Sequence, residues 1–201
     1  MMTSQIEDRL SLLVMKSFTQ KDPQNIQAVK DYCLKHFTKQ LDALQEKMIY
    51  SDSIYYEKEI LLVNNEIEVI VSGWLPGNTC FPHDHDQAEC FVFVLNGRVE
   101  NTLLDFDNGR LEITHKTVKQ GGDNLYLGAG IIHYMQNIGN ENLICLHVYT
   151  PGISEMRVFD DQHKIIYTLS GEAGAWLPPK EKSYILEARS YSKPEVDAVI
   201  I

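Results

Sequence analysis

Most of this chain consists of short β-rich segments separated by turn residues, and this pattern limits the fold more than any other feature. Between Ile60 and Leu169 such segments recur at the spacing typical of sandwiches and barrels. No helix of ordinary length interrupts them, which argues against parallel βαβ units. Asn96-Gly97 and Asp107-Asn108-Gly109 are strong hairpin signals. We therefore expect a mainly β fold with roughly ten strands and hairpins at both turns.

Residues 4–48 have helical periodicity instead. Ser4 and Glu7 have the spacing of a capping box, and Pro23 lies near the start of a second helix. From Ile26 to Leu44, apolar residues recur every three or four positions and form one stripe. We expect two amphipathic helices packed against a sheet.

The length of 201 residues, with 44% hydrophobic residues, is sufficient for one well-buried domain. We divide it into a helical segment (residues 1–50), a β-barrel (residues 51–170) and a C-terminal arm packed on the barrel (residues 171–201). Within the arm, SYILEARSY is expected to add one edge strand.

The overall charge points to small molecules as partners. A formal net charge of -10 argues against binding to nucleic acid or to an anionic membrane surface, since both need clustered Lys and Arg. No apolar run is long enough to span a bilayer, and the N-terminus lacks the order of a signal peptide. The four cysteines form no CxxC pair, so we interpret them as thiols. We expect a cytoplasmic monomer.

Three histidines are candidate metal ligands. His83 and His85 are two residues apart at the start of an extended segment, so their side chains should point to one face. His133 follows several predicted strands, and we expect the fold to bring it back to the first two. Three other histidines lie outside this pattern and are expected at the surface or in hairpins: His36, His115 and His163.

The spacing around these histidines resembles the two motifs of the cupin superfamily. Gly77 stands five residues before His83, and Gly97 closes the first motif. The second motif is matched by Gly122, Gly128-Ala129-Gly130, His133 and Asn137, with Gly128 where the family usually has proline. The resemblance implies a cupin-type jelly-roll β-barrel with its metal bound by His83, His85 and His133.

The first motif departs from the cupin pattern at its glutamate ligand. Counting back from Gly97, the usual glutamate position falls on Cys90, and Glu89 is its neighbour. Adjacent strand residues face opposite ways, so only one of the two can point toward the metal. The position of the Asn96-Gly97 turn favours Cys90.

A cupin with cysteine at this position resembles the cysteine dioxygenase family of thiol dioxygenases. The likeness extends through CLHVYTPGISEMRVFD (residues 145–160) and covers the chain from Tyr55 to Asp160. It implies that His147 and Tyr149 are the family's outer histidine and its active-site tyrosine. Cys90 and Tyr149 correspond to the pair that some members join by a thioether bond.

This resemblance implies Fe(II) as the cofactor and the oxidation of a small carboxylate-bearing thiol, such as cysteine or a 3-mercaptopropionate-like compound, by O2 to a sulfinic acid. Three neutral imidazoles carry one less negative charge than a two-histidine-one-carboxylate site, which favours an anionic substrate ligand. We expect Tyr149 to hydrogen-bond the bound thiolate or dioxygen, with His147 orienting Tyr149.

Two cations are candidates for holding the substrate carboxylate. Where cysteine-specific members have a Tyr-x-Arg segment, this chain has Tyr56-Glu57-Lys58, and lysine lacks the planar fork of arginine. Arg157 is the second candidate, because enzymes acting on 3-mercaptopropionate-like thiols take their arginine from about this region.

Two alternatives fit the same motifs. One is a cupin enzyme of different chemistry that uses Glu89 as a fourth metal ligand. The other is a non-catalytic, metal-containing cupin that binds a small molecule.

Overall fold

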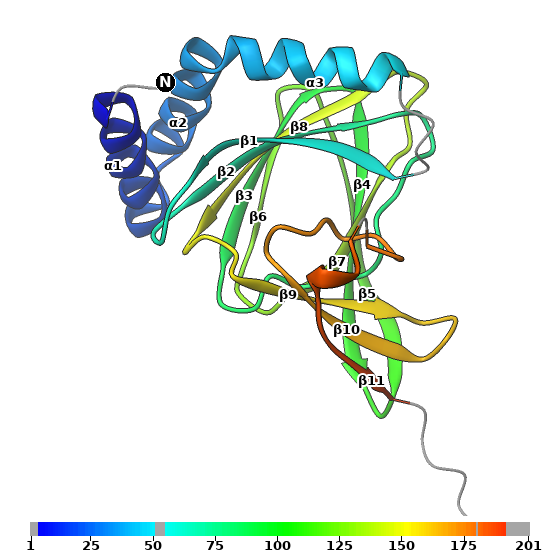
Figure 1. Cartoon of the computed structure of the whole chain (residues 1–201). Coiled ribbons are helices and arrows are strands. Elements are labelled where there is room, and N and C mark those ends of the chain that lie inside the picture. Colours follow the sequence, from blue (N-terminus) through cyan, green and yellow to red (C-terminus); the bar gives the residue numbers. More distant parts are fainter. Residues whose placement is uncertain (1–3, 51–54, 180, 192–201) are drawn as a thin grey trace, which may run out of the picture.

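Two antiparallel β-sheets face each other, and three helices cover the outer face of one of them (Figure 1). The computed structural model of the chain describes residues 4–50, 55–179 and 181–191. Two opposed antiparallel sheets of this kind form the jelly-roll barrel of cupins. The predicted mainly β cupin fold with N-terminal helices is confirmed.

The first sheet is buried on both faces. Its strands follow the order β1-β2-β8-β3-β6. On β2, Val69 and Val71 pack against the helices, whereas Ile70 and Trp74 point into the barrel. The same alternation on β3 and β8 explains why these segments are almost continuously hydrophobic. The strand bounds are β1 Tyr56–Val63, β2 Glu68–Trp74, β3 Glu89–Asn96, β6 Asn124–Leu127 and β8 Leu143–Thr150.

The second sheet consists of two three-stranded parts, β5-β4-β7 and β11-β10-β9. Residues 77–84 join them: His83 exchanges backbone hydrogen bonds of 2.9 Å with His133 on β7, and the Asp84 N–H donates to the Arg157 carbonyl on β9 at 3.0 Å. We call residues 77–85, which also include His85, the linking segment. The strand bounds are β4 Arg98–Asp107, β5 Arg110–Gln120, β7 Ile132–Asn137, β9 Glu155–Asp160, β10 Ile165–Ser170 and β11 Ile185–Ser190.

The helical segment contains α1 (Ser4–Gln20), α2 (Pro23–His36) and α3 (Thr38–Tyr50). The prediction of one continuous second helix was wrong, because the chain bends at Phe37. The Phe37 side chain is fully buried, so the apolar stripe continues through the bend. Beyond the bend, α3 runs along β1 and β2. Within the described residues, no helix is both long enough and apolar enough to cross a membrane.

The turns illustrate what a local signal can predict. Asn108 and Gly109 have positive φ and close the β4–β5 hairpin as expected, and the predicted edge strand in the arm is β11. Gly97 also has positive φ, and a Cβ there would lie 2.7 Å from Leu143 Cα. The predicted hairpin was wrong, however, because β3 and β4 belong to different sheets. Asn-Gly specifies a tight turn, whereas burial between β8 and β6 decides the pairing of β3.

After β10 the chain crosses over the barrel beside β1. Residues 171–177, which we call the strap, place Ala173, Ala175 and Leu177 in the interior core. The Phe81 N–H donates to the Ala175 carbonyl at 2.9 Å, and the Tyr55 hydroxyl donates to the Leu177 carbonyl at 2.8 Å. The strap is therefore held by both sheets.

We predict that Phe18→Ala lowers the free energy of unfolding by about 3 to 5 kcal/mol, because Phe18 is buried against Phe91, with ring centroids 4.6 Å apart. Leu12→Ala on the same helix is the control, since Leu12 is 60% exposed, and it should change stability by less than about 0.5 kcal/mol. Urea denaturation measures both. Equal effects of the two substitutions would contradict this packing of α1.

Candidate metal centre

The fold brings the three predicted ligands together. His83 and His85 come from the linking segment and His133 from β7, and one nitrogen of each lies within 4.8 Å of the others. All three side chains are buried. The cluster lies where the linking segment and β7 pair, so backbone hydrogen bonds set its geometry.

Hydrogen bonds orient two of the three imidazoles. His83 Nδ1 lies 2.8 Å from the Phe81 carbonyl oxygen, and His133 Nδ1 lies 2.9 Å from Asn101 Oδ1 on β4. Because these oxygens only accept, each Nδ1 carries the hydrogen and each Nε2 is left with a lone pair. Among the described residues, the Nε2 of His133 is the buried side-chain nitrogen or oxygen without a hydrogen-bond partner. An orphaned nitrogen aimed into a histidine cluster is what a metal ligand needs.

The protonation states agree with this role. Burial lowers the pKa of His83, and it lowers the pKa values of His85 and His133 well below the ordinary value. Neutral imidazole is the form that binds metal. A set of three neutral imidazoles suits a divalent first-row transition metal.

The strand carrying Cys90 turns this residue inward. Cys90 is fully buried in the interior core, directly opposite Tyr149 on β8. Glu89 is only partly buried and lies near Lys21 in the α1–α2 turn, outside the barrel, where the pKa of Lys21 is raised chiefly by its hydrogen bond with Tyr126 and also by the charge of Glu89. This orientation gives Glu89 no access to the histidines and disfavours the alternative with a fourth, carboxylate ligand.

A cavity beside the three histidines is lined by both predicted outer residues, His147 and Tyr149. The volume open to the centre of a water molecule is about 20 Å³, which is space for about one water. The other lining residues are Tyr56, Ile70, Trp74, Cys80 and Met135.

A hydrogen-bonded chain of fixed direction reaches this cavity. Trp74 Nε1 donates to Ser72 Oγ at 2.9 Å, and Ser72 Oγ lies 2.8 Å from His147 Nε2. Since an indole N–H only donates, Ser72 Oγ accepts from Trp74. The Ser72 hydroxyl is buried, so its own hydrogen also needs a partner, and His147 Nε2 is the acceptor beside it. The neutral ring of His147 then carries its hydrogen on Nδ1, 3.3 Å from the Tyr149 hydroxyl.

The end of this chain is Tyr149, whose hydroxyl hydrogen-bonds the Cys90 side chain. Burial raises the pKa of Tyr149 well above its ordinary value, so the hydroxyl keeps its hydrogen. Burial also lowers the pKa of His147 to about 3, which keeps that ring neutral. Tyr149 is thus a buried donor, 5.0 Å from His85 between ring centroids.

The two predicted substrate cations lie away from the cavity lining. Lys58 follows Tyr56 on the same face of β1, but its Nζ donates to the Ala173 carbonyl of the strap at 2.7 Å. The Arg157 guanidinium is bound by the Asp84 carboxylate. The described structure thus gives each cation an acceptor within the protein.

Sequence reasoning missed several residues of the site. Ser72 and Trp74 lie in a predicted strand, but nothing in their spacing marks them as partners of His147. Asn101 is equally unmarked, because its contact with His133 depends on the β4–β7 register. The expected placement of the other histidines was correct for His115 and His163, which are exposed, while His36 is partly buried against Tyr32.

The fold and the site define a cupin with a buried three-histidine metal centre. The sequence profile of the family described as "Cysteine dioxygenase type I" matches residues 10–162, more than half of the chain, and the chain belongs to this family.

Curated relatives are distant. The chain is 27% identical over 105 residues to cysteine dioxygenase type 1 of Danio rerio, covering 49% of this chain and 52% of the relative. It is 26% identical over 124 residues to cysteine dioxygenase type 1 of Rattus norvegicus, covering 57% of this chain and 62% of the relative. The match thus spans between half and two thirds of each relative.

Two solved structures illustrate the structural likeness. One is an uncharacterized conserved protein with a double-stranded β-helix domain from Klebsiella pneumoniae subsp. pneumoniae, with a TM-score of 0.46 and 23% identity over 58% of this chain and 94% of that chain. The other is oxalate oxidase in complex with glycolate, with a TM-score of 0.45 and 18% identity over 50% of this chain and 53% of that chain.

We predict that His133→Ala abolishes stoichiometric binding of a divalent metal, because it removes one of three ligands. Cys90→Ala should leave metal binding intact, and Asn101→Leu should weaken it by about 10- to 100-fold by removing the acceptor that orients His133. Titration of the metal-free protein with Co(II), followed by absorption, measures all three. Equal loss of metal in Cys90→Ala and His133→Ala would make Cys90 a ligand.

Proposed function

We propose that this protein is a non-haem iron thiol dioxygenase that converts a small carboxylate-bearing thiol, of the cysteine or 3-mercaptopropionate type, and O2 to a sulfinic acid. The observation that carries the proposal is the buried cluster of three neutral histidines beside the Tyr149 hydroxyl, without a carboxylate ligand from β3. Membership of the cysteine dioxygenase family supports it.

The donor set supports binding of a thiolate rather than a neutral thiol. Three uncharged imidazoles leave the charge of a divalent ion uncompensated, so an anionic substrate sulfur is favoured. Ferrous iron, when bound, would supply the redox chemistry that transfers both atoms of O2 to the sulfur. His83, His85 and His133 would hold it.

Tyr149 contributes a hydrogen bond of fixed direction. Its hydroxyl stays protonated, and the chain from Trp74 through Ser72 and His147 supplies a donor to the phenol oxygen. The Tyr149 hydrogen is therefore directed away from His147, toward Cys90 and the cavity. In this position it can donate to the substrate sulfur or to an oxygen transferred to it, in a site from which water is largely excluded.

The substrate carboxylate is assigned to Lys58. Lys58 shares a strand face with Tyr56, which lines the cavity, and a carboxylate is a stronger acceptor for its Nζ than the Ala173 carbonyl. Glu68 opposes this assignment, since it is buried opposite Tyr149 and close enough to Lys58 for each charge to act on the other. A preference for thiols that carry a carboxylate would therefore indicate that Lys58 selects the substrate. A preference for thiols that carry a cation would indicate Glu68.

We predict thiol-dependent O2 uptake by the Fe(II)-loaded protein, with sulfinate as product. An anaerobically reconstituted sample is mixed with O2 and with cysteine, 3-mercaptopropionate, mercaptosuccinate or cysteamine, while oxygen is followed by electrode and product by mass spectrometry. Carboxylate-bearing thiols should be oxidised faster than cysteamine. His133→Ala, which lacks one of the three ligands, is the control for oxidation by free iron. No uptake above this control with any thiol would reject the proposal, and a preference for cysteamine would reject Lys58 as the selecting residue.

We also predict that Ser72→Ala lowers kcat/KM by about 10- to 100-fold with unchanged metal content. The substitution leaves His147 Nε2 without its donor, so the ring is no longer fixed with its hydrogen toward Tyr149. Ser72→Thr keeps the hydroxyl and should retain most of the activity. Similar turnover in Ser72→Ala and the unaltered protein would show that the direction of this chain is irrelevant to the reaction.

A further inference from the structure

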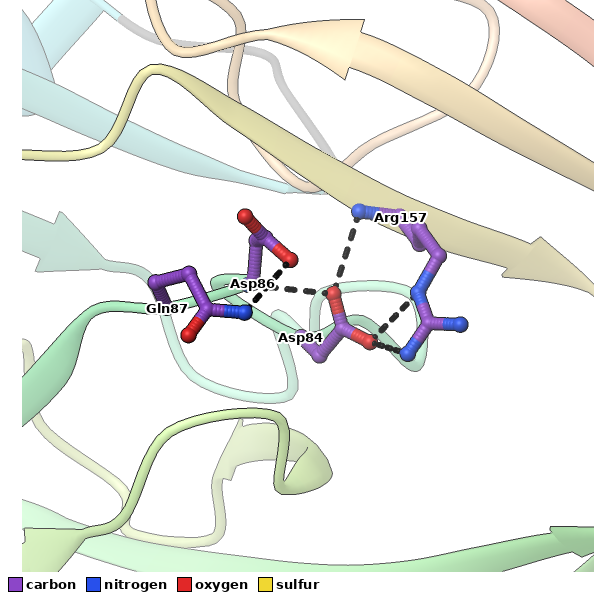
Figure 2. A network of polar contacts seen from close by, with 4 residues as sticks. All are labelled: Asp84, Asp86, Gln87 and Arg157. Carbon is purple, nitrogen blue, oxygen red and sulfur yellow. Dashed lines mark hydrogen bonds and ion pairs between the residues drawn. The ribbon is translucent and has the colours of Figure 1, made fainter.

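Arg157 has no part in the reaction proposed above, yet its side chain is tied to the centre of the metal-binding segment. Its partner is Asp84, the residue between His83 and His85 (Figure 2). Because neighbouring residues of an extended segment face opposite ways, Asp84 points away from the histidine cluster and toward β9.

The contact between the two residues involves backbone and side chain. Arg157 Nε donates to Asp84 Oδ2 at 2.7 Å, and Arg157 Nη2 donates to the same oxygen. The backbone N–H groups of Arg157 and Asp86 both lie 3.3 Å from Asp84 Oδ1 (Figure 2). In the opposite direction, the Asp84 N–H donates to the Arg157 carbonyl at 3.0 Å.

Because Asp84 is buried, its charge depends on the contact with Arg157. The Asp84 side chain is 0% exposed, whereas that of Arg157 is 42% exposed. A fully buried carboxylate needs its counter-charge, because without it the desolvation of the charge is not compensated. Asp84 is therefore held at one position relative to β9, and its flanking histidines are held with it.

We propose that Arg157 is a positioning residue for the metal centre: through Asp84 it fixes the segment carrying His83 and His85 against β9. His83 is also paired by backbone hydrogen bonds with His133 on β7. The Asp84–Arg157 pair thus completes the alignment of all three ligands before metal binds. The inference rests on the proposed function only in requiring a metal at the three histidines, and it holds for any substrate.

The test is a set of four variants: Asp84→Asn, Arg157→Gln, the double variant, and Arg157→Lys. Each metal-free protein is titrated with Co(II), and affinity and the visible spectrum of the bound ion are recorded together with the Tm of the metal-free form. We expect each neutralising single variant to weaken Co(II) affinity by about 10- to 100-fold and to change the spectrum. The double variant should be no weaker than the worse single variant, because both remove one interaction. Arg157→Lys should recover part of the affinity by keeping the charge.

Lys47→Ala is the matched control, because it removes the cation of an ion pair with Glu59 that joins α3 to β1. It should leave Co(II) affinity and spectrum unchanged. Unaltered Co(II) binding in both neutralising single variants would overturn the inference, as would losses in the double variant equal to the sum of the single losses. Should the unaltered protein bind Co(II) but show no thiol-dependent O2 uptake, the proposed function would fail while this test remained valid.

Discussion

The backbone pairing of the linking segment, residues 77–85, is the interaction on which the rest of the structure depends. One side of this segment bonds to β7 and the other to β9, so it joins two three-stranded parts into one sheet. Two of the three ligand histidines lie on it. The backbone pairing that closes the barrel therefore also brings the three histidines together. A change that loosens the sheet at this point also separates the ligands.

Residues whose role follows from short-range spacing could be predicted from the sequence. His83 and His85 are two positions apart, His133 lies in a second motif of defined spacing, and alternation along one strand indicated Cys90 rather than Glu89. The strands themselves were predictable because turn residues separate them. Asn96-Gly97 illustrates the limit, since its turn was right and its strand pairing wrong.

Residues whose role depends on register between distant strands could not be predicted. Ser72 contacts His147 because β2 and β8 pair in one register, and Asp84 contacts Arg157 because the linking segment meets β9. Such contacts are set by the packing of the complete barrel. Packing of the barrel likewise places Arg157, which was expected at the substrate, against Asp84. The bend at Phe37 could not be predicted because the apolar stripe continues through it without interruption.

The helices contribute to the chemistry of the interior although they lie outside the barrel. They cover the outer faces of β2, β3 and β8, while the barrel core covers the inner faces, so water is excluded from both sides of these strands. Polar groups inside, such as Ser72 and His147, must then be satisfied by one another, and electrostatic interactions between them are stronger than in water. Trp74 donates to Ser72, and the buried Ser72 hydrogen has His147 as its acceptor, which gives this network its direction.

The strap, residues 171–177, also covers one side of the cavity. Its Ala175 N–H donates to the Tyr56 hydroxyl at 3.0 Å, and Trp176 lies edge-on to the Tyr56 ring, so residues 171–177 cover the cavity on the side that Tyr56 lines. These residues lie beyond the part of the chain that matches the family profile, which ends at residue 162. The cavity is thus covered on this side by a stretch outside the residues that the family profile matches, whereas His83, His85 and His133 lie within them.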